Sequence, residues 1–204
     1  MKRACLILGF LVLAVIWTGP LLSAWRTSFA AHMLAHMGVV AVVAPLIAVG
    51  ASGKMPAVKP SLPLIASLVE LIVVWGWHAP AARLWAESSV SAAVLEQASF
   101  LIAGLFLWLT CLAPVEKPAQ LASGALALLL TSIHMTLLGA LLSLASRPLY
   151  GVGDVTCFGV VLDAGQDQAL GGVVMLMIGA IVYLAGGVFL LSRLLSDRRE
   201  RLAG

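Results

Sequence analysis

Two of the chain's four histidines, His32 and His36, stand four residues apart near the start of a long apolar segment. This spacing places both imidazoles on the same face of a helix, about one turn apart. Met33 and Met37 directly follow them, and Cu(I) accepts imidazole nitrogen together with thioether sulfur. The phrase therefore indicates part of a metal site, provided that the rest of the chain folds around it.

The composition places most of the chain in a lipid bilayer. Of its 204 residues, 62% are hydrophobic and only 10% are charged, with a mean hydropathy of +1.08. A soluble domain could not bury so much apolar surface, and the apolar runs lack the alternation of barrel strands. We expect a single all-α membrane domain over residues 1–204, a polytopic transmembrane helix bundle of six spans. A span needs roughly 20 helical residues. The expected spans are 5–22, 29–49, 62–77, 92–112, 121–144 and 169–195.

The first span allows two interpretations. Lys2 and Arg3 precede it, and a basic start before an apolar run is also the layout of a cleaved signal peptide. Its apolar stretch is longer than the usual core of a signal peptide, so we expect a retained helix. The segment from Arg83 to Val90 is expected to lie along the membrane interface, with Trp85 as an anchor.

Basic residues predict the orientation, because they favour the cytoplasmic side of short loops. With the N-terminus in the cytoplasm, three of the 12 basic residues, Arg26, Arg83 and Arg147, fall on the outer side and the other nine on the inner side. Both termini are then cytoplasmic. The net charge of +3 reflects this topology and does not indicate nucleic-acid binding, and the basic C-terminal end is expected to touch anionic membrane lipid.

All four histidines fall in the outer half of the predicted bundle. His32 and His36 begin the second span, His78 ends the third, and His134 lies about three turns before the outer end of the fifth, at about 1.5 Å per residue. Ionisable groups inside a span are costly and usually mark function, although a histidine can also serve as an interhelical hydrogen-bond partner. We expect His32, His36 and His134 to be the core metal ligands, with His78 at or next to the site.

Methionine sulfur could complete the ligand set. Adjacent residues on a helix are offset by about 100°, so a methionine cannot share the face of the histidine beside it, and at most one should join. The candidates are Met33, Met37, Met135 and Met175.

Two further groups carry separate expectations. Glu70 lies near the middle of the third span, where an unpaired carboxylate would be expensive; we expect it to be neutral or bonded to a serine such as Ser67, with a proton or ion relay as the alternative. Cys157 is expected to be a small buried residue, with a redox or metal-binding thiol as the alternative.

The longest connection, 145–168, is expected on the outer side. Long loops without regular structure tend to be functional, and this one is expected to pack over the histidines. Asp167 is expected to cap the start of the last span, because a carboxylate there meets free backbone N–H groups and the positive end of the helix dipole.

Five phrases, in this order along residues 28–180, resemble the CtaG family of cytochrome c oxidase assembly factors. This is the multi-span family first linked to caa-type oxidases, and it is unrelated to the copper chaperones that share the name. The phrases are Ser28 to Met37 followed by Ala44-Pro45-Leu46; Trp77-His78-Ala79-Pro80; Leu95 to Phe100; His134-Met135 followed by Arg147 to Tyr150; and Asp167 to Gly172 with Met175.

The resemblance implies a bacterial inner-membrane protein that helps a haem-copper oxidase mature, plausibly by handling copper. The residues that match the family's polar positions are His32, His36, His78, Glu96, His134, Asp167 and Gln168. The chain departs from the family at Gln97, where relatives often have histidine after the glutamate. If that histidine is a ligand elsewhere, the site here is assembled differently.

Three function classes follow. The favoured one is a non-enzymatic assembly factor that binds Cu(I) at a periplasmic-side His/Met site and delivers it, with cytochrome c oxidase subunits or other copper chaperones as partners. The residues expected to support the ligands from behind, or to have a structural role only, are Glu70, Glu96, Gln97, Asp167 and Gln168. The alternatives are a copper or small-solute transporter, which would need a polar path that the chain lacks below Glu70, and a haem-binding electron carrier, which needs histidines on opposite sides of the haem. No motif with a nucleophile and a placed base suggests an enzyme.

Overall fold

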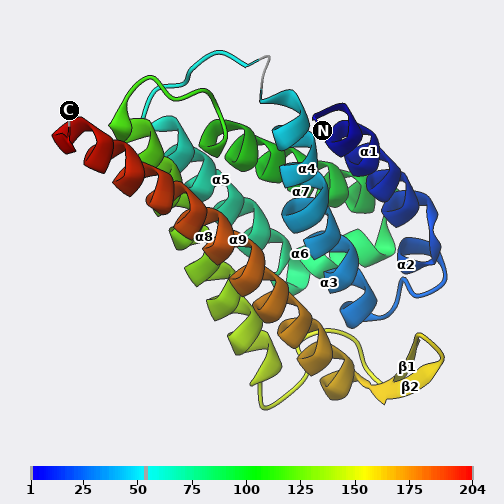
Figure 1. Cartoon of the computed structure of the whole chain (residues 1–204). Coiled ribbons are helices and arrows are strands. Elements are labelled where there is room, and N and C mark those ends of the chain that lie inside the picture. Colours follow the sequence, from blue (N-terminus) through cyan, green and yellow to red (C-terminus); the bar gives the residue numbers. More distant parts are fainter. Residues whose placement is uncertain (1, 53–54, 204) are drawn as a thin grey trace.

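The computed structural model describes the backbone of residues 2–52 and 55–203, and the side chains as far as residue 199. Lys54 and Arg201, both assigned to the inner side above, lie outside the residues whose side chains are described. The chain is 78% helical, which confirms the all-α prediction. Figure 1 shows both termini toward one end of the bundle, with a small β-hairpin at the other end.

The first half of the chain forms three segments, each made of more than one helix. The helices are α1 (Lys2–Thr18), α2 (Pro20–Ser23), α3 (Phe29–Met37), the π-helical turn η1 (Gly38–Val43), α4 (Ala44–Ala51), α5 (Leu62–Trp77) and α6 (Pro80–Ser88). The second half contains α7 (Val90–Cys111), α8 (Pro118–Ser143), the strands β1 (Asp154–Cys157) and β2 (Val160–Asp163), and α9 (Ala164–Ala203).

Among the described residues, five helical segments are long and apolar enough to cross a membrane, and a bent pair makes a sixth possible. The five are Lys2–Ser23, Phe29–Ala51, Val90–Cys111, Pro118–Ser143 and Ala164–Arg199. The bent pair is α5 with α6, which meet at 72°. These segments fit a multi-pass membrane protein, and their bounds lie close to the predicted spans except at α9, which begins at Ala164 and not at residue 169.

The bend between α5 and α6 has a local cause. Pro80 cannot continue α5, because proline lacks the backbone N–H and disfavours a helical residue before it, and it stands instead at the start of α6. The indoles of Trp77 and Trp85 stack across the bend, with ring centroids 5.8 Å apart. Helix α6 corresponds to the segment expected along the interface.

The expectation of an unstructured connection over 145–168 is wrong. Asp154–Cys157 and Val160–Asp163 pair antiparallel, with Cys157 opposite Val160, and the turn between them contains Phe158 at φ 49° and Gly159 at φ 81°. Positive φ at both turn residues is the geometry of a tight hairpin turn. The β-branched residues on either side of Phe158-Gly159 were the available sequence signal.

The π-helical turn shifts the hydrogen bonding of the second span directly after His36. Pro45 has no N–H to donate, and the N–H of Ala44 bonds the carbonyl of Val39. The carbonyl of Val40 is therefore free of helical partners and accepts a hydrogen bond from the Trp108 indole at 3.0 Å. This turn locks the second span against α7.

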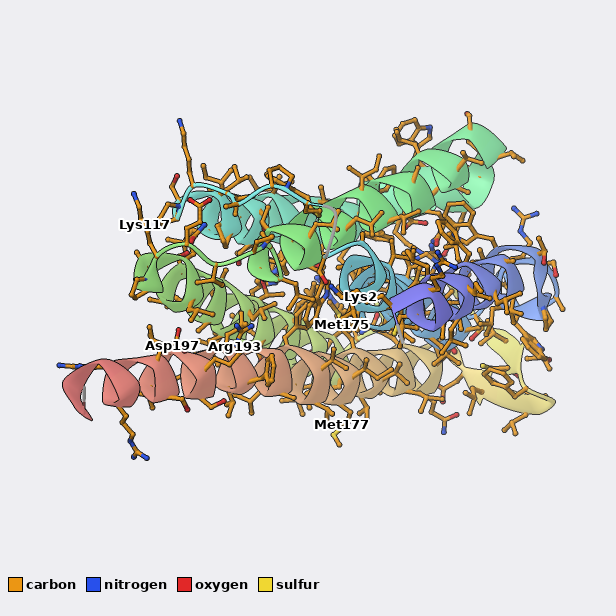
Figure 2. The ribbon with its side chains drawn as sticks, turned by 45° about the horizontal axis from the view of Figure 1, so that its top comes forward. Lys2, Lys117, Met175, Met177, Arg193 and Asp197 are labelled. Atoms are coloured by element: carbon orange, nitrogen blue, oxygen red, sulfur yellow. The ribbon has the colours of Figure 1, made fainter. Side chains whose placement is uncertain are left out.

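Helices α8 and α9 form a long antiparallel pair that leans against the other helices (Figure 1). Figure 2 shows Lys117 at the same end of the bundle as the C-terminal part of α9, away from the hairpin. It also shows Met175 pointing from α9 toward the other helices and Met177 pointing away. The two side chains are accordingly 0% and 50% exposed.

Candidate functional site

The N-terminus of α3 is held in place by a residue of α9. Asp167 accepts hydrogen bonds from the Ser28 hydroxyl at 2.7 Å, the Phe29 N–H at 2.5 Å and the Ala30 N–H at 3.2 Å. The Ser28 hydroxyl also accepts from the Ala31 N–H. The expectation that Asp167 caps its own helix is therefore wrong, since its carboxylate instead satisfies the free N–H groups of the helix that carries His32 and His36.

Gln168 ties α8 and α9 together at the end of the bundle that carries the hairpin. Its amide donates to the carbonyl of Leu142 at 3.1 Å and accepts from the Leu149 N–H at 2.6 Å. Both Asp167 and Gln168 thus act as positioning residues for the site that follows.

His32 belongs to a buried polar network with Arg83 and Glu96. Arg83 donates a hydrogen bond to His32 Nδ1 at 3.0 Å, so the proton of the neutral ring is on Nε2, which lies 3.3 Å from Glu96 Oε1. The Arg83 guanidinium lies 3.0 Å from Glu87 and 3.6 Å from Glu96. Both nitrogens of His32 therefore have protein partners.

Arg83 was not expected at the site, because it was read as a loop residue of the interface. It is only 5% exposed. The available signal was Glu87 four residues later, which places a carboxylate on the same face of the short helix.

His78 and Met33 meet in the interior. The carbonyl of Val74 can only accept, so His78 Nδ1, at 2.6 Å from it, carries the ring proton. His78 Nε2 then has a free lone pair, and it lies 3.3 Å from the sulfur of Met33, which has no proton to donate. Two lone-pair donors in van der Waals contact are a geometry that a soft cation could stabilise.

His36 completes this group. It is fully buried, and neither of its ring nitrogens has a hydrogen-bond partner in the described part of the chain. Its ring centroid lies 5.6 Å from that of His78 and 3.9 Å from that of Phe100. Met33 and His36 are three residues apart on α3, and both side chains contact His78, the residue directly after α5.

His134 lies in α8, buried and with both ring nitrogens unpartnered among the described residues. No hydrogen bond, ion pair or ring contact in residues 2–52 and 55–199 joins it to the other three histidines. The structure thus brings together His32, His36 and His78, and leaves His134 apart from them.

The four methionines that the sequence suggested as ligands lie where α3, α8 and α9 meet. A side chain placed at Gly171 would meet Met33, and one placed at Gly179 would meet Met37 and Met135. Met175 is on the same face of α9, one turn from each of these glycines, and is fully buried. It therefore lies toward α3, at the level of Met33 to Met37.

The connection after α8 covers the site at the hairpin end of the bundle. Tyr150 stacks on Phe29 with centroids 4.5 Å apart, and its hydroxyl donates to the carbonyl of His78 at 2.6 Å. Burial raises the pKa of Tyr150 to about 12, so the phenol stays protonated at neutral pH and can donate. Cys157 of the hairpin packs against Ala30 and Ala31 as a small buried residue.

Glu70 lies deeper, in a second polar cluster. It accepts a hydrogen bond from the Tyr183 hydroxyl at 2.9 Å, whereas Ser67, its expected partner, is bonded to Thr131 at 2.9 Å. Of the two alternatives expected for Glu70, the bond to Ser67 is not formed because Tyr183 reaches across from α9, and a neutral Glu70 stays a prediction.

Within the described residues, no three His, Cys, Asp or Glu side chains converge in a way that could hold a metal ion. This finding concerns those four residue types and does not extend to methionine sulfur. A site for Cu(I) built from two imidazoles and one thioether is compatible with it, since soft Cu(I) accepts both ligand types.

The profile of one protein family, described as cytochrome c oxidase caa3 assembly factor (Caa3_CtaG), matches residues 1–197. The chain belongs to this family. The match confirms the resemblance drawn from the five phrases and covers nearly the whole chain. No curated protein and no solved structure shows significant similarity to it.

Proposed function

We propose that this caa3 oxidase assembly factor binds Cu(I) through Met33, His36 and His78 near the periplasmic face of the bacterial inner membrane, and delivers it to an oxidase subunit. The family match supports the oxidase assembly role. The observation that carries the copper proposal is the contact of His78 Nε2 with the Met33 sulfur, beside a fully buried His36 whose nitrogens are both unpaired within the described chain.

A buried polar group without a partner costs about 1–3 kcal/mol, more in lipid than in water, so a cation bound by imidazoles and a thioether that lie together would stabilise them. Protonating the rings would bury cations in an apolar bundle. A Cu(I) ion satisfies the free lone pairs at once. It also leaves with ease from three neutral ligands, as transfer to a client requires, whereas a closed thiolate site would hold it more firmly.

This ligand set differs from the predicted one in two residues. His32 is not used because Arg83 and Glu96 engage both its nitrogens, and His134 is not used because no described contact joins it to the site. Instead, Met33 and His78 enter the set. His32, Arg83 and Glu96 fix α3, α6 and α7 relative to one another.

The structure favours copper over haem for a steric reason. The ring centroid of His36 lies 3.9 Å from that of Phe100 and 5.6 Å from that of His78, so Phe100 would have to move before a macrocycle could lie beside these imidazoles. Bis-histidine haem would need the two rings to lie on opposite sides of a flat macrocycle. We therefore keep copper as the proposed cargo.

The cellular test uses a host strain that lacks its own copy of the gene and depends on a caa3-type oxidase. The wild-type gene should restore the copper content and activity of the oxidase, and the His36→Ala variant should restore neither, although its level in the membrane is unchanged. His134→Ala is the matched control, a buried histidine outside the site, and it should restore both. Full restoration by His36→Ala would refute the copper proposal.

A further inference from the structure

A cavity of about 560 Å³ lies between α1 and α2 on one side and α6 and α7 on the other. Most of its wall is apolar, with Trp17, Leu21, Val90 and Val94 among the lining residues. Val90 and Val94 are also 77% and 63% exposed on the outside of the bundle. The cavity therefore reaches the lipid-facing surface, and its volume is that of a small-molecule site.

One polar side chain in this wall lacks any partner. Gln97 is 8% exposed and lines the cavity, and neither its amide nitrogen nor its amide oxygen has a hydrogen-bond partner in the described structure. Buried amides are nearly always paired, because an unpaired one loses its bonds to water without replacement. Both amide atoms are inaccessible to solvent, so a ligand that offers a donor and an acceptor would satisfy Gln97 once its side chain turns toward the cavity.

The charges at the cavity favour an uncharged ligand. Its wall contains two cations, Arg26 and Arg83, and two anions, Glu87 and Glu96. Arg83 is already engaged by His32 and by both carboxylates, and Arg26 donates to the backbone carbonyl of Glu87 at 3.2 Å. A phosphate or an ammonium head would meet a like charge as readily as an opposite one.

The depth of Gln97 in the bundle also favours an uncharged ligand. Gln97 is seven residues into α7, roughly 10 Å below the start of that helix, at 1.5 Å per residue. A charged phospholipid head stays at the membrane surface, whereas an uncharged head with a single hydroxyl can lie that deep. A hydroxyl is both a donor and an acceptor, which matches the two free atoms of the Gln97 amide.

We propose that this cavity binds a membrane amphiphile with an uncharged, hydroxyl-bearing head, whose hydroxyl pairs with Gln97 and whose hydrocarbon chain lies along Val90 and Val94. Two sources share this chemistry, an isoprenoid quinol and a diacylglycerol. The site does not depend on copper, since none of the three proposed metal ligands lines the cavity.

Binding is tested on the full-length chain, purified in detergent, stripped of lipid and kept free of copper. The probes are a decyl-substituted benzoquinol held reduced by ascorbate and dioctanoylglycerol, each measured by equilibrium dialysis in matched detergent. Phosphatidylglycerol serves as the charged comparison. We expect at least one uncharged probe to bind in preference to phosphatidylglycerol, and whichever binds identifies the source.

Two variants test the position of the ligand. Gln97→Leu keeps the volume and removes both hydrogen bonds, which should weaken binding by about tenfold or more. Ala93→Phe fills the cavity and should abolish binding. Ile102→Leu, a conservative change at a 67% exposed position of the same helix, should have no effect.

The proposal is overturned if neither uncharged probe binds, if phosphatidylglycerol binds more tightly than both, or if Gln97→Leu and Ala93→Phe bind as the wild type does. If Gln97→Leu does not fold, the result with Ala93→Phe decides. Copper binding, measured separately, stays intact in a folded Gln97→Leu variant, so failure here and failure of the copper proposal are distinct results.

Discussion

Two of the buried polar clusters in the described part of the chain differ in how many of their polar groups are paired with one another. In the Glu70 cluster most groups bond to one another: Tyr183 to Glu70, Ser67 to Thr131, and Trp108 to the carbonyl that the π-helical turn frees. Of the Glu70 carboxyl group, only Oε2 has no hydrogen-bond partner among the described residues. The second cluster is the group of Met33, His36 and His78.

In that second cluster the lone pairs of imidazole and thioether face one another without a proton between them, and His36 has no partner among the described residues. A cluster whose polar groups are mostly hydrogen-bonded to one another stabilises the fold, because breaking it costs those hydrogen bonds. A cluster of imidazole nitrogens and a thioether sulfur with free lone pairs is suited to bind a soft metal ion. This contrast leads us to read the Glu70 cluster as structural and the histidine cluster as functional.

The proposed role of the histidine cluster in copper delivery requires that the cluster faces the periplasm. Val152, in the connection that covers the cluster, is 94% exposed. A Val152→Cys variant should therefore be labelled completely by a membrane-impermeant thiol reagent in intact cells, because the basic residues predict that this end is outside. The wild-type chain provides the background, since two of its three cysteines are buried. Protection of Val152→Cys until the cells are lysed would reverse the orientation.

The next largest effect is expected at Asp167, which joins α9 to the helix of the histidine cluster. Asp167→Ala removes three hydrogen bonds to a carboxylate and should lower the free energy of unfolding by about 3 kcal/mol or more. Unfolding in mild detergent measures it. Asp167→Asn, which keeps an acceptor oxygen, should lose clearly less. Equal stability of Asp167→Ala and the wild type would show that the cap has no energetic role.

A smaller effect is expected in the Glu70 cluster. Tyr183→Phe removes the hydroxyl that donates to Glu70 and should destabilise the protein by about 1–2 kcal/mol, because a buried acceptor is left unpaired. Cu(I) affinity should stay at the wild-type value. A loss of copper binding without a loss of stability would mean that the two clusters act together and would end the distinction between them.

The smallest effect is expected at His134. His134→Ala should leave Cu(I) affinity within about twofold of the wild-type value, because changes at sites without shared contacts act independently. Competition with a chromogenic Cu(I) chelator measures this. A large loss of affinity would return His134 to the ligand set, as the sequence predicted, and would exclude the arrangement proposed from the structure.

The features that depend only on the linear pattern of residues, such as the bounds of spans and the family membership, could be predicted from the sequence. The bounds of the second, third and fourth spans follow from long apolar runs that end in proline, glycine or polar residues, and the structure places them within two residues of the prediction. The family could be recognised because five short phrases keep their order. The grouping of His36 with His78 near the end of the third span followed from depth along the helices.

The rest depends on how the helices rotate and cross, which a linear pattern does not contain. Depth placed His134 level with His36, but the direction of its ring depends on the packing of α8 against α9. Asp167 was expected to serve its own helix, because local capping is the usual case, and its real partners are 137 to 139 residues away in the sequence. Burial of Arg83 required the sharp bend after His78.

The most direct test of the central claim compares two methionines of the same helix. Met33 and Met37 are both fully buried, but of the two only the Met33 sulfur lies within hydrogen-bonding distance of His78. Under anaerobic conditions, the wild type and Met37→Leu should each bind one Cu(I) per chain with similar affinity. Loss of an outer partner typically costs 10–100-fold in metal affinity, so Met33→Leu, which removes a ligand, should lose about 100-fold. Failure of the wild type to bind Cu(I), or equal binding by Met33→Leu and Met37→Leu, would contradict the proposed site.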